Sequence, residues 1–363
     1  MTTPLAGRLS ATVAGLYPGY FALVMATGIV SIACRLMSLE ALASALLAVN
    51  LAAYGVLAAL TLARAALYPG RLLADLASHA RGPGFFTLVA GTNVLGSQCL
   101  LVAGWRGAAG ALWGVGLLLW VAVMYAFFTA VIVRREKPTL AEGINGAWLI
   151  AAVATQSVAV LGIALATPFG FEAETVAFVA LVFFLVGSML YLAIITLIFY
   201  RFTFLALETA TLTPPYWINM GAVAIATLAG SSLLLAAERS PLLTTMVPFL
   251  AGFTLFFWST ATWWIPLLVL LGAWRHLWRR HPLVYDPQYW GMVFPLGMYS
   301  AATFRLAEAL PFAPLAGVAR AMLPVALLVW VATAFGMAAA GLRALRTGST
   351  PPSIEAAGPS NVD

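Results

Sequence analysis

Long apolar segments alternate with short polar loops along the whole chain, and every second apolar segment ends in arginine. These terminal arginines recur about every 70 residues, and they are Arg64, Arg134-Arg135, Arg201, Arg275 and Arg343. A near-constant period of this length is typical of a repeated structural unit. Each unit contains two apolar segments, so the pattern predicts five consecutive helical hairpins.

The apolar segments are long enough to cross a lipid bilayer. Stretches of 18 or more residues without a charge recur, and about 20 residues of helix cross a hydrocarbon core of about 30 Å. Backbone groups in lipid must be hydrogen-bonded within their own segment, which favours helices. The predicted helices span residues 17–34, 40–63, 84–103, 108–133, 146–165, 174–200, 216–236, 243–273, 289–307 and 316–342.

Composition supports a membrane location. Of the 363 residues, 63% are hydrophobic and 8% are charged, and a soluble protein of this length needs more charge to cover its surface. The alternating pattern of an outer-membrane barrel is absent. We therefore predict an all-α polytopic membrane protein with residues 1–15 as an N-terminal segment, 16–345 as the ten-helix membrane domain and 346–363 as a disordered tail.

The positive charge is distributed unevenly between the loops. Thirteen of the 18 Lys and Arg residues lie near the N-terminus, after the even-numbered helices or in the tail. The positive-inside rule then places both termini in the cytoplasm, with the chain in the cell (inner) membrane. This distribution explains the net charge of +6 without nucleic acid as a partner.

The odd-numbered helices contain most of the polar and small residues. Because polar groups are costly in lipid, this asymmetry favours five odd helices around a central polar path and five even helices outside. The alternative is that small residues merely permit close helix packing. The candidate lining residues are Thr27, Gly28, Ser31, Thr92, Asn93, Thr155, Gln156, Asn219, Gly297 and Ser300.

The chemistry along this path suits anions better than cations or protons. The middle of each odd helix lacks Asp, Glu, Lys and His, whereas proton-coupled transporters and cation pathways usually carry ionisable groups there. Hydroxyl and amide groups with basic residues at one mouth favour anions. The two cysteines and three histidines form no metal pattern, and no catalytic motif is present, so we expect no metal, no cofactor and no enzymatic activity.

Pro295 lies in the middle of the ninth predicted helix, directly after Phe294. Proline removes a helical hydrogen bond and bends the helix. The bend could present Phe294 to a narrow pore, where a phenyl ring excludes water and ions. The alternative is a kinked helix with Phe294 packed on a neighbour, and the residues alone favour that alternative.

Three stretches, Met25–Ile29, Gly146–Ile150 and Tyr289–Thr303, together resemble the tellurite-resistance/dicarboxylate transporter family. This family includes the plant guard-cell slow anion channels, a yeast malate permease and fungal sulfite efflux pumps. The resemblance extends over about residues 15–345.

The resemblance implies five helical hairpins around a quasi-five-fold central pore, usually in a homotrimer with one pore per subunit. It implies Phe294 as the gate and Pro295 as the helix kink. Two functions follow as alternatives: a gated path for small inorganic anions or C4-dicarboxylates, or a proton-linked transporter of malate or of sulfite- and tellurite-type oxyanions. In either case the partners expected are a small anion and the lipid bilayer.

Overall fold

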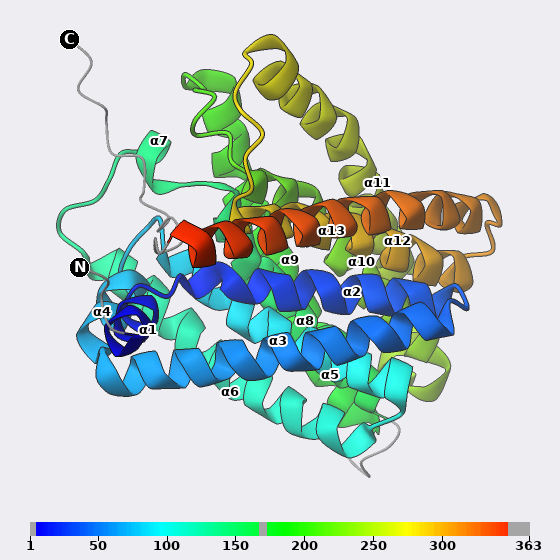
Figure 1. The fold of residues 1–363 in the computed structure, drawn as a ribbon. Helices are drawn as coiled ribbons and strands as arrows, with labels where there is room; N and C mark the ends of the chain where they lie inside the picture. The colour runs from blue at the N-terminus through cyan, green and yellow to red at the C-terminus, as the bar shows by residue number, and fades with distance from the viewer. Residues whose placement is uncertain (1–4, 167–172, 348–363) are drawn as a thin grey trace.

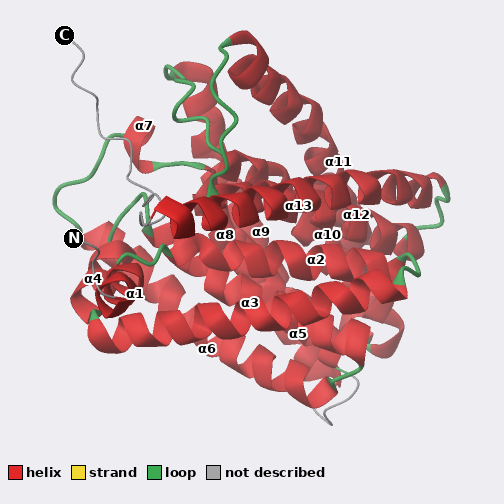
Figure 2. Ribbon diagram, viewed as in Figure 1, coloured by secondary structure: helices red, strands yellow, loops and turns green. Residues whose placement is uncertain are grey.

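A computed structural model of the chain describes residues 5–166 and 173–347, and in these ranges it consists of helices and loops (Figure 2). Two sets of five long helices alternate along the chain, and they run beside one another in the bundle (Figure 1). The first set, which we call the inner helices, comprises α2 (Ala22–Leu36), α5 (Phe86–Ala103), α8 (Ile150–Leu165), α10 (Ile218–Ala236) and α12 (Trp290–Ala309). The second set, the outer helices, comprises α3 (Glu40–Leu67), α6 (Arg106–Val133), α9 (Ala173–Phe204), α11 (Pro241–Ala273) and α13 (Pro314–Thr347).

The inner helices contact one another in a closed cycle. Helix α2 packs against α5, α5 against α8, α8 against α10, α10 against α12, and α12 against α2. Each inner helix also packs against the outer helix that follows it in the chain. The chain therefore forms two concentric layers, as the alternation of polar and apolar segments predicts.

Burial separates the two layers. In the segment that contains α8, 83% of the residues in the apolar stretch that could cross the membrane are buried. The corresponding share is 28% in α6 and 11% in α13. The outer helices expose large apolar side chains, including Leu62, Leu118, Leu328 and Phe335. Exposed apolar area of this extent is compatible with a lipid surface and not with water, so the chain is an all-α polytopic membrane protein.

Nine helical segments in the described residues are long and apolar enough to cross a membrane. Helix α12 is not one of them, although it corresponds to the ninth predicted span. It has 20 residues and contains Pro295, Arg305 and Glu308, which lower its hydropathy. The count of ten spans and the five-fold pore therefore stay predictions.

Every inner helix begins with a short 3-10 turn. These turns are η1 (Pro18–Phe21), η2 (Gly82–Phe85), η3 (Gly146–Leu149), η4 (Pro214–Trp217) and η7 (Pro287–Tyr289). Four of the five have proline at the first or second position, where its fixed φ and missing N–H cost little. Turn η1 contacts η2, η2 contacts η3, η3 contacts η4, η4 contacts η7 and η7 contacts η1. We call this closed ring the collar.

Glycine permits the close approach of neighbouring collar turns. A Cβ atom on Gly146 would lie 2.3 Å from the carbonyl oxygen of Pro215, and one on Gly84 would lie 2.8 Å from the backbone nitrogen of Gly19. Both contacts are with backbone atoms, which cannot rotate away. Turn η3 thus begins with glycine, where most other turns have proline.

Arginines at the ends of the outer helices bind the loops that lead into the collar. Four of the repeated arginines donate a hydrogen bond to a backbone carbonyl. In each case, this carbonyl lies just before the collar turn of the hairpin to which the arginine belongs. The pairs are Arg64 with Leu16, Arg134 with Ala77, Arg201 with Ile144, and Arg275 with Leu212. The sequence repeat is therefore also a repeated contact, which ties four of the outer helices to the start of the inner helix in the same hairpin.

Shorter elements complete the fold: α1 (Leu5–Ala14), α4 (Pro69–Leu76), α7 (Leu140–Gly143), η5 (Ala237–Arg239) and the π-helical turn η6 (Trp274–Trp278). Helix α1 occupies most of the predicted N-terminal segment. Helix α13 ends at Thr347, and residues 348–363 of the predicted tail lie outside the described residues.

Candidate functional site

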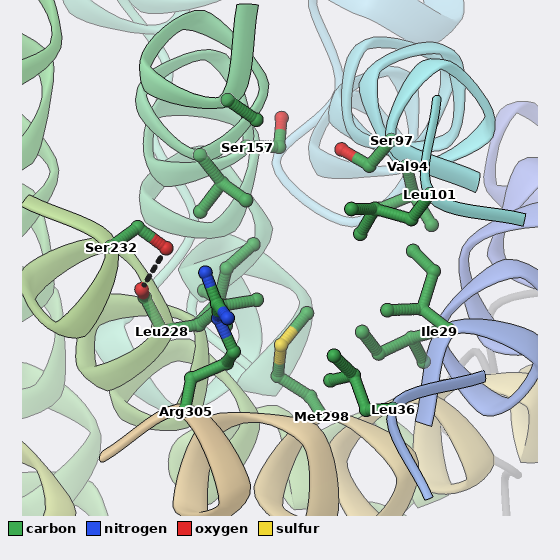
Figure 3. Close-up of a pocket in the computed structure, with 14 residues that line it drawn as sticks. Ile29, Leu36, Val94, Ser97, Leu101, Ser157, Leu228, Ser232, Met298 and Arg305 are labelled. Atoms are coloured by element: carbon green, nitrogen blue, oxygen red, sulfur yellow. Dashed lines mark hydrogen bonds between the residues drawn. The ribbon is translucent and has the colours of Figure 1, made fainter. Parts of the chain in front are cut away.

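A cavity of about 90 Å³ lies between the five inner helices, toward their C-terminal ends (Figure 3). Its volume corresponds to roughly three water molecules. We call this the cavity end of the bundle and the opposite end, which holds the collar, the basic end. The cavity is lined by Ile29, Ile32, Leu36, Val94, Ser97, Leu101, Ser157, Val160, Ala164, Ile225, Leu228, Ser232, Met298 and Arg305.

The lining residues follow one register in all five helices. In each of the first four inner helices, a lining residue is followed by others three and seven positions later, which lie on the same helix face. The four sets are Ile29/Ile32/Leu36, Val94/Ser97/Leu101, Ser157/Val160/Ala164 and Ile225/Leu228/Ser232, and α12 contributes Met298 and Arg305 seven positions apart. Counting back eleven positions from Ile29, Val94, Ser157, Ile225 and Met298 leads to Pro18, Pro83, Gly146, Pro214 and Pro287 in the collar.

Phe294 lies on the same face of α12, one turn from Met298 toward the basic end. Its side chain is 0% exposed. The matching positions, four residues before the first lining residue of each other inner helix, are Met25, Ala90, Val153 and Gly221, and all are buried. Phe294 is the aromatic residue of this layer, and three of its four counterparts are small or β-branched.

Pro295 packs against α10. A Cβ atom on Gly221 would lie 2.7 Å from Cγ of Pro295, so the absence of a side chain at Gly221 lets the two helices approach closely. The proline lies inside α12, which continues from Trp290 to Ala309. The position of Phe294 is therefore fixed by a tight contact at the next residue.

The walls of the cavity are mainly apolar. The hydroxyl groups of its three serines donate hydrogen bonds to backbone carbonyls of their own helices. Ser97 donates to the carbonyl of Asn93 at 3.0 Å, Ser157 to that of Ala154 at 2.6 Å, and Ser232 to that of Leu228 at 2.8 Å. A hydroxyl group has one proton to donate. These serines thus present oxygen atoms to the cavity while their protons stay bonded to the helix backbone.

Arg305 is the charged residue among those that line the cavity. Figure 3 shows its side chain extending from α12 toward Leu228 and Ser232. Its Nη1 atom donates to Oε2 of Glu308 at 2.6 Å, one helical turn onward, and both side chains are about a third or more exposed. The guanidinium group therefore lies at the border between the cavity and the surface.

Several of the predicted lining residues form hydrogen bonds with outer helices. The Oγ1 atoms of Thr27 and Thr155 accept from the indole N–H groups of Trp330 and Trp120, at 3.0 and 2.8 Å. Thr92 bonds the hydroxyl of Tyr54 at 3.1 Å. Ser31 and Ser300 donate to the carbonyls of Ala43 and Ala319, and Gln156 donates to that of Phe184. These contacts hold the two layers together.

The other predicted lining residues lie between helices. Asn93 donates to Ser157 of the neighbouring inner helix at 3.2 Å, and the carbonyl of Asn219 accepts from Tyr191 at 3.3 Å. Gly28 and Gly297 are positions of close packing. None of the ten predicted lining residues is among those that line the cavity, and their assignment to a pore stays a prediction.

The cavity has four polar lining residues that are not among the candidate lining residues selected from the sequence: Ser97, Ser157, Ser232 and Arg305. The first three were indistinguishable from the other small polar residues of the odd helices. Arg305 lies near the end of the ninth predicted helix, among the five basic residues outside the N-terminal, even-helix and tail groups. The signal that would have found them is the three- and seven-residue register shared by the five helices.

Two ion pairs at the basic end share one aspartate. Asp75 pairs with Arg64 at 2.7 Å and with Arg81 at 2.8 Å. Burial, followed by the positive charges of Arg134 and Lys137, lowers the pKa of His79. Within the described residues, no group of three His, Cys, Asp or Glu side chains could hold a metal ion.

Comparisons with known proteins find a family match and relatives named as membrane proteins and transporters. Residues 15–338 match the model of the voltage-dependent anion channel family. The chain is 38% identical over 148 residues to an uncharacterized membrane protein of Mycobacterium tuberculosis, covering 41% of this chain and 75% of the relative. It is 24% identical over 298 residues to an uncharacterized transporter of Methanocaldococcus jannaschii, covering 79% of this chain and 82% of the relative.

Long apolar helices in two layers around a lined cavity are compatible with a membrane transport protein. The chain belongs to the voltage-dependent anion channel family, which confirms the resemblance found in the sequence and supports membrane transport of anions as its general function.

Proposed function

We propose that the protein is a gated path for small anions, which pass between the five inner helices, and that Phe294 is the gate. The observation that carries this proposal is the position of Phe294. It is fully buried, and it shares a helix face with two residues that line the cavity, Met298 and Arg305. The cavity therefore ends, toward the basic end, at the layer that contains the phenyl ring.

The phenyl ring of Phe294 can close this layer because it is larger than most of the side chains at the matching positions of the other inner helices. The counterparts of Phe294 include Ala90 and Val153, whose side chains are smaller than a phenyl ring. An apolar constriction of this kind excludes water and so blocks ions. Truncation of Phe294 to alanine removes the ring and should join the cavity to the space near the collar.

Orientation and assembly belong to the same proposal. The collar and its arginines would face the cytoplasm, as the positive-inside rule indicates, and the cavity would open on the opposite side of the cell membrane. The exposed apolar faces of the outer helices would contact lipid or the neighbouring subunits of a homotrimer.

Flux from reconstituted liposomes tests the function. We expect chloride efflux from vesicles with Phe294→Ala to exceed that with the wild-type protein by about tenfold or more, because an apolar constriction that excludes water is removed. Phe257→Ala is the matched control, because Phe257 is equally buried but lies on the outer helix α11. Equal efflux from the two variants would refute the gate.

The same vesicles distinguish the alternative, a proton-linked transporter. Efflux through a passive path is independent of a pH gradient and persists when a protonophore is added with valinomycin and potassium. Malate added outside that alkalinises the external medium, because protons enter the vesicle with the anion, would favour the coupled transporter if the protonophore abolishes the pH change. Chloride, nitrate, malate, succinate and sulfite compared in one preparation would then identify the anion.

A further inference from the structure

The cavity has one side chain suited to hold an anion, and that side chain already has an internal partner. Arg305 carries the positive charge of the cavity lining, and Glu308 accepts one of its hydrogen bonds at 2.6 Å. A guanidinium group has five N–H donors. Among the described residues, Arg305 forms one hydrogen bond to a side chain. Its remaining N–H groups can therefore donate to a ligand.

The rest of the lining offers an anion little. The hydroxyl protons of Ser97, Ser157 and Ser232 are bonded to helix carbonyls, and the other lining residues are apolar. An anion in the cavity therefore loses water and gains a donor group only at Arg305. Since guanidinium groups form short, strong hydrogen bonds to oxyanions, the position of Arg305 determines where an anion is held.

We propose that Arg305 is the anion-capture residue of the cavity and that Glu308 is its built-in competitor. A small monovalent anion that enters from the cavity end displaces the carboxylate of Glu308 from the guanidinium group and is held beside Ser232, about three helical turns before the Phe294 layer. When the anion leaves, Glu308 returns to Arg305. This inference rests on the proposed anion path.

Competition by Glu308 keeps the capture site weak. A free arginine in an apolar cavity would hold an anion tightly and slow its release, whereas conduction requires binding that is favourable for entry and weak enough for exit. The carboxylate exchanges for the anion, so the guanidinium group is paired before and after each passage. The lone positive charge also favours a monovalent anion over a dianion, whose second charge would face apolar walls.

A second ion pair at the cavity end provides a matched control. Arg35 pairs with Glu40 at 2.8 Å, with side chains 40% and 66% exposed. Arg35 precedes the lining residue Leu36 on α2 but is not among the residues that line the cavity. Substitutions in this pair change the charge of the same end of the bundle without changing the cavity.

The experiment measures nitrate binding in two ways. In detergent, the midpoint of thermal unfolding is followed against nitrate concentration, since a ligand that binds the folded state raises this midpoint. In liposomes, the concentration for half-maximal nitrate flux is measured in the Phe294→Ala background. The variants are Arg305→Gln, Arg305→Lys, Glu308→Gln, Arg35→Gln and Glu40→Gln.

We expect Glu308→Gln to lower the half-maximal nitrate concentration roughly threefold and Arg305→Gln to raise it roughly fivefold, magnitudes that fit partly exposed charge pairs. Arg305→Lys should fall between Arg305→Gln and the wild type, while both control variants stay within a factor of about 1.5 of the wild type. An Arg305→Gln variant that matches Arg35→Gln in both assays would overturn the inference, as would a Glu308→Gln variant that binds nitrate more weakly.

The two readouts separate this inference from the proposed function. Absence of flux through every Phe294→Ala protein would refute the anion path, while the nitrate-dependent unfolding midpoint would still report on Arg305. Flux through Phe294→Ala that is indifferent to Arg305 and Glu308 would refute the capture site alone.

Discussion

Substitution of Gly146 by alanine tests whether the collar depends on close backbone contact between neighbouring turns. A Cβ atom at this position would lie 2.3 Å from the carbonyl oxygen of Pro215 and 2.6 Å from Cα of Tyr216. An ordinary contact for Cβ is 3.4 Å or more, so turns η3 and η4 would have to separate by about 1 Å. Overpacking of this kind costs about 3 kcal/mol.

The expected result is a lower thermal stability. A loss of about 3 kcal/mol corresponds to a fall in the unfolding midpoint of about 4 °C for a chain of this size. The midpoint would be measured in detergent by tryptophan fluorescence at a fixed scan rate, because membrane proteins often unfold irreversibly.

Gly114→Ala is the control for the change from glycine to alanine. Gly114 lies inside the outer helix α6, and a Cβ atom there would meet nothing within 4 Å. Alanine is favoured over glycine in a helix by up to about 1 kcal/mol, so this variant should unfold at the wild-type temperature or slightly above. An unfolding midpoint of Gly146→Ala as high as that of Gly114→Ala would refute the account of the collar.

Two further variants probe the basic end. Arg201→Met should lower the unfolding free energy by about 2 kcal/mol, because it removes the bond to the carbonyl of Ile144 and the contact with the ring of Tyr216; chemical denaturation measures this, and an unchanged midpoint would contradict it. Burial raises the pKa of Asp286 above its ordinary value of 3.8, while the Gln288 N–H and Arg275 oppose this shift. The folded protein then binds the extra proton, so this group's contribution to stability falls as the pH rises from about 3.8 through the raised pKa. Asp286→Asn keeps an acceptor for the Gln288 N–H, and it should be at least as stable as the wild type at pH 7 and lose this pH dependence. Unfolding scans from pH 4 to 8 measure both. A variant less stable than the wild type would show that the charge of Asp286 is stabilising.

The sequence predicts the layers well because membrane insertion imposes a strong pattern. Helix α3 begins at Glu40 and α6 ends at Val133, as predicted. The inner helices begin a few residues later than expected, because residues such as Pro18–Phe21 and Gly146–Leu149 form 3-10 turns. The hydropathy of a residue is the same in a 3-10 turn as in an α-helix, so hydropathy does not show where the turn ends and the α-helix begins.

The site was harder to predict than the fold. The direction of a polar side chain within a buried helix depends on which neighbour offers a partner, and Thr27 and Thr155 find tryptophans of the outer layer. Hydropathy shows that a helix is polar without showing which face is polar. The repeated arginines are a similar case, since their spacing indicated topology but not their bonds to the loops ahead of the collar.

The central claim is that the side chain at position 294 closes the path. Its most direct test is the current carried by chloride across a planar bilayer for the series Phe294→Leu, Phe294→Val and Phe294→Ala, with equal amounts of folded protein incorporated. The account predicts that the current rises at each step as side-chain volume is removed. A current that stays at the wild-type level through the whole series, while each variant unfolds cooperatively, would contradict it.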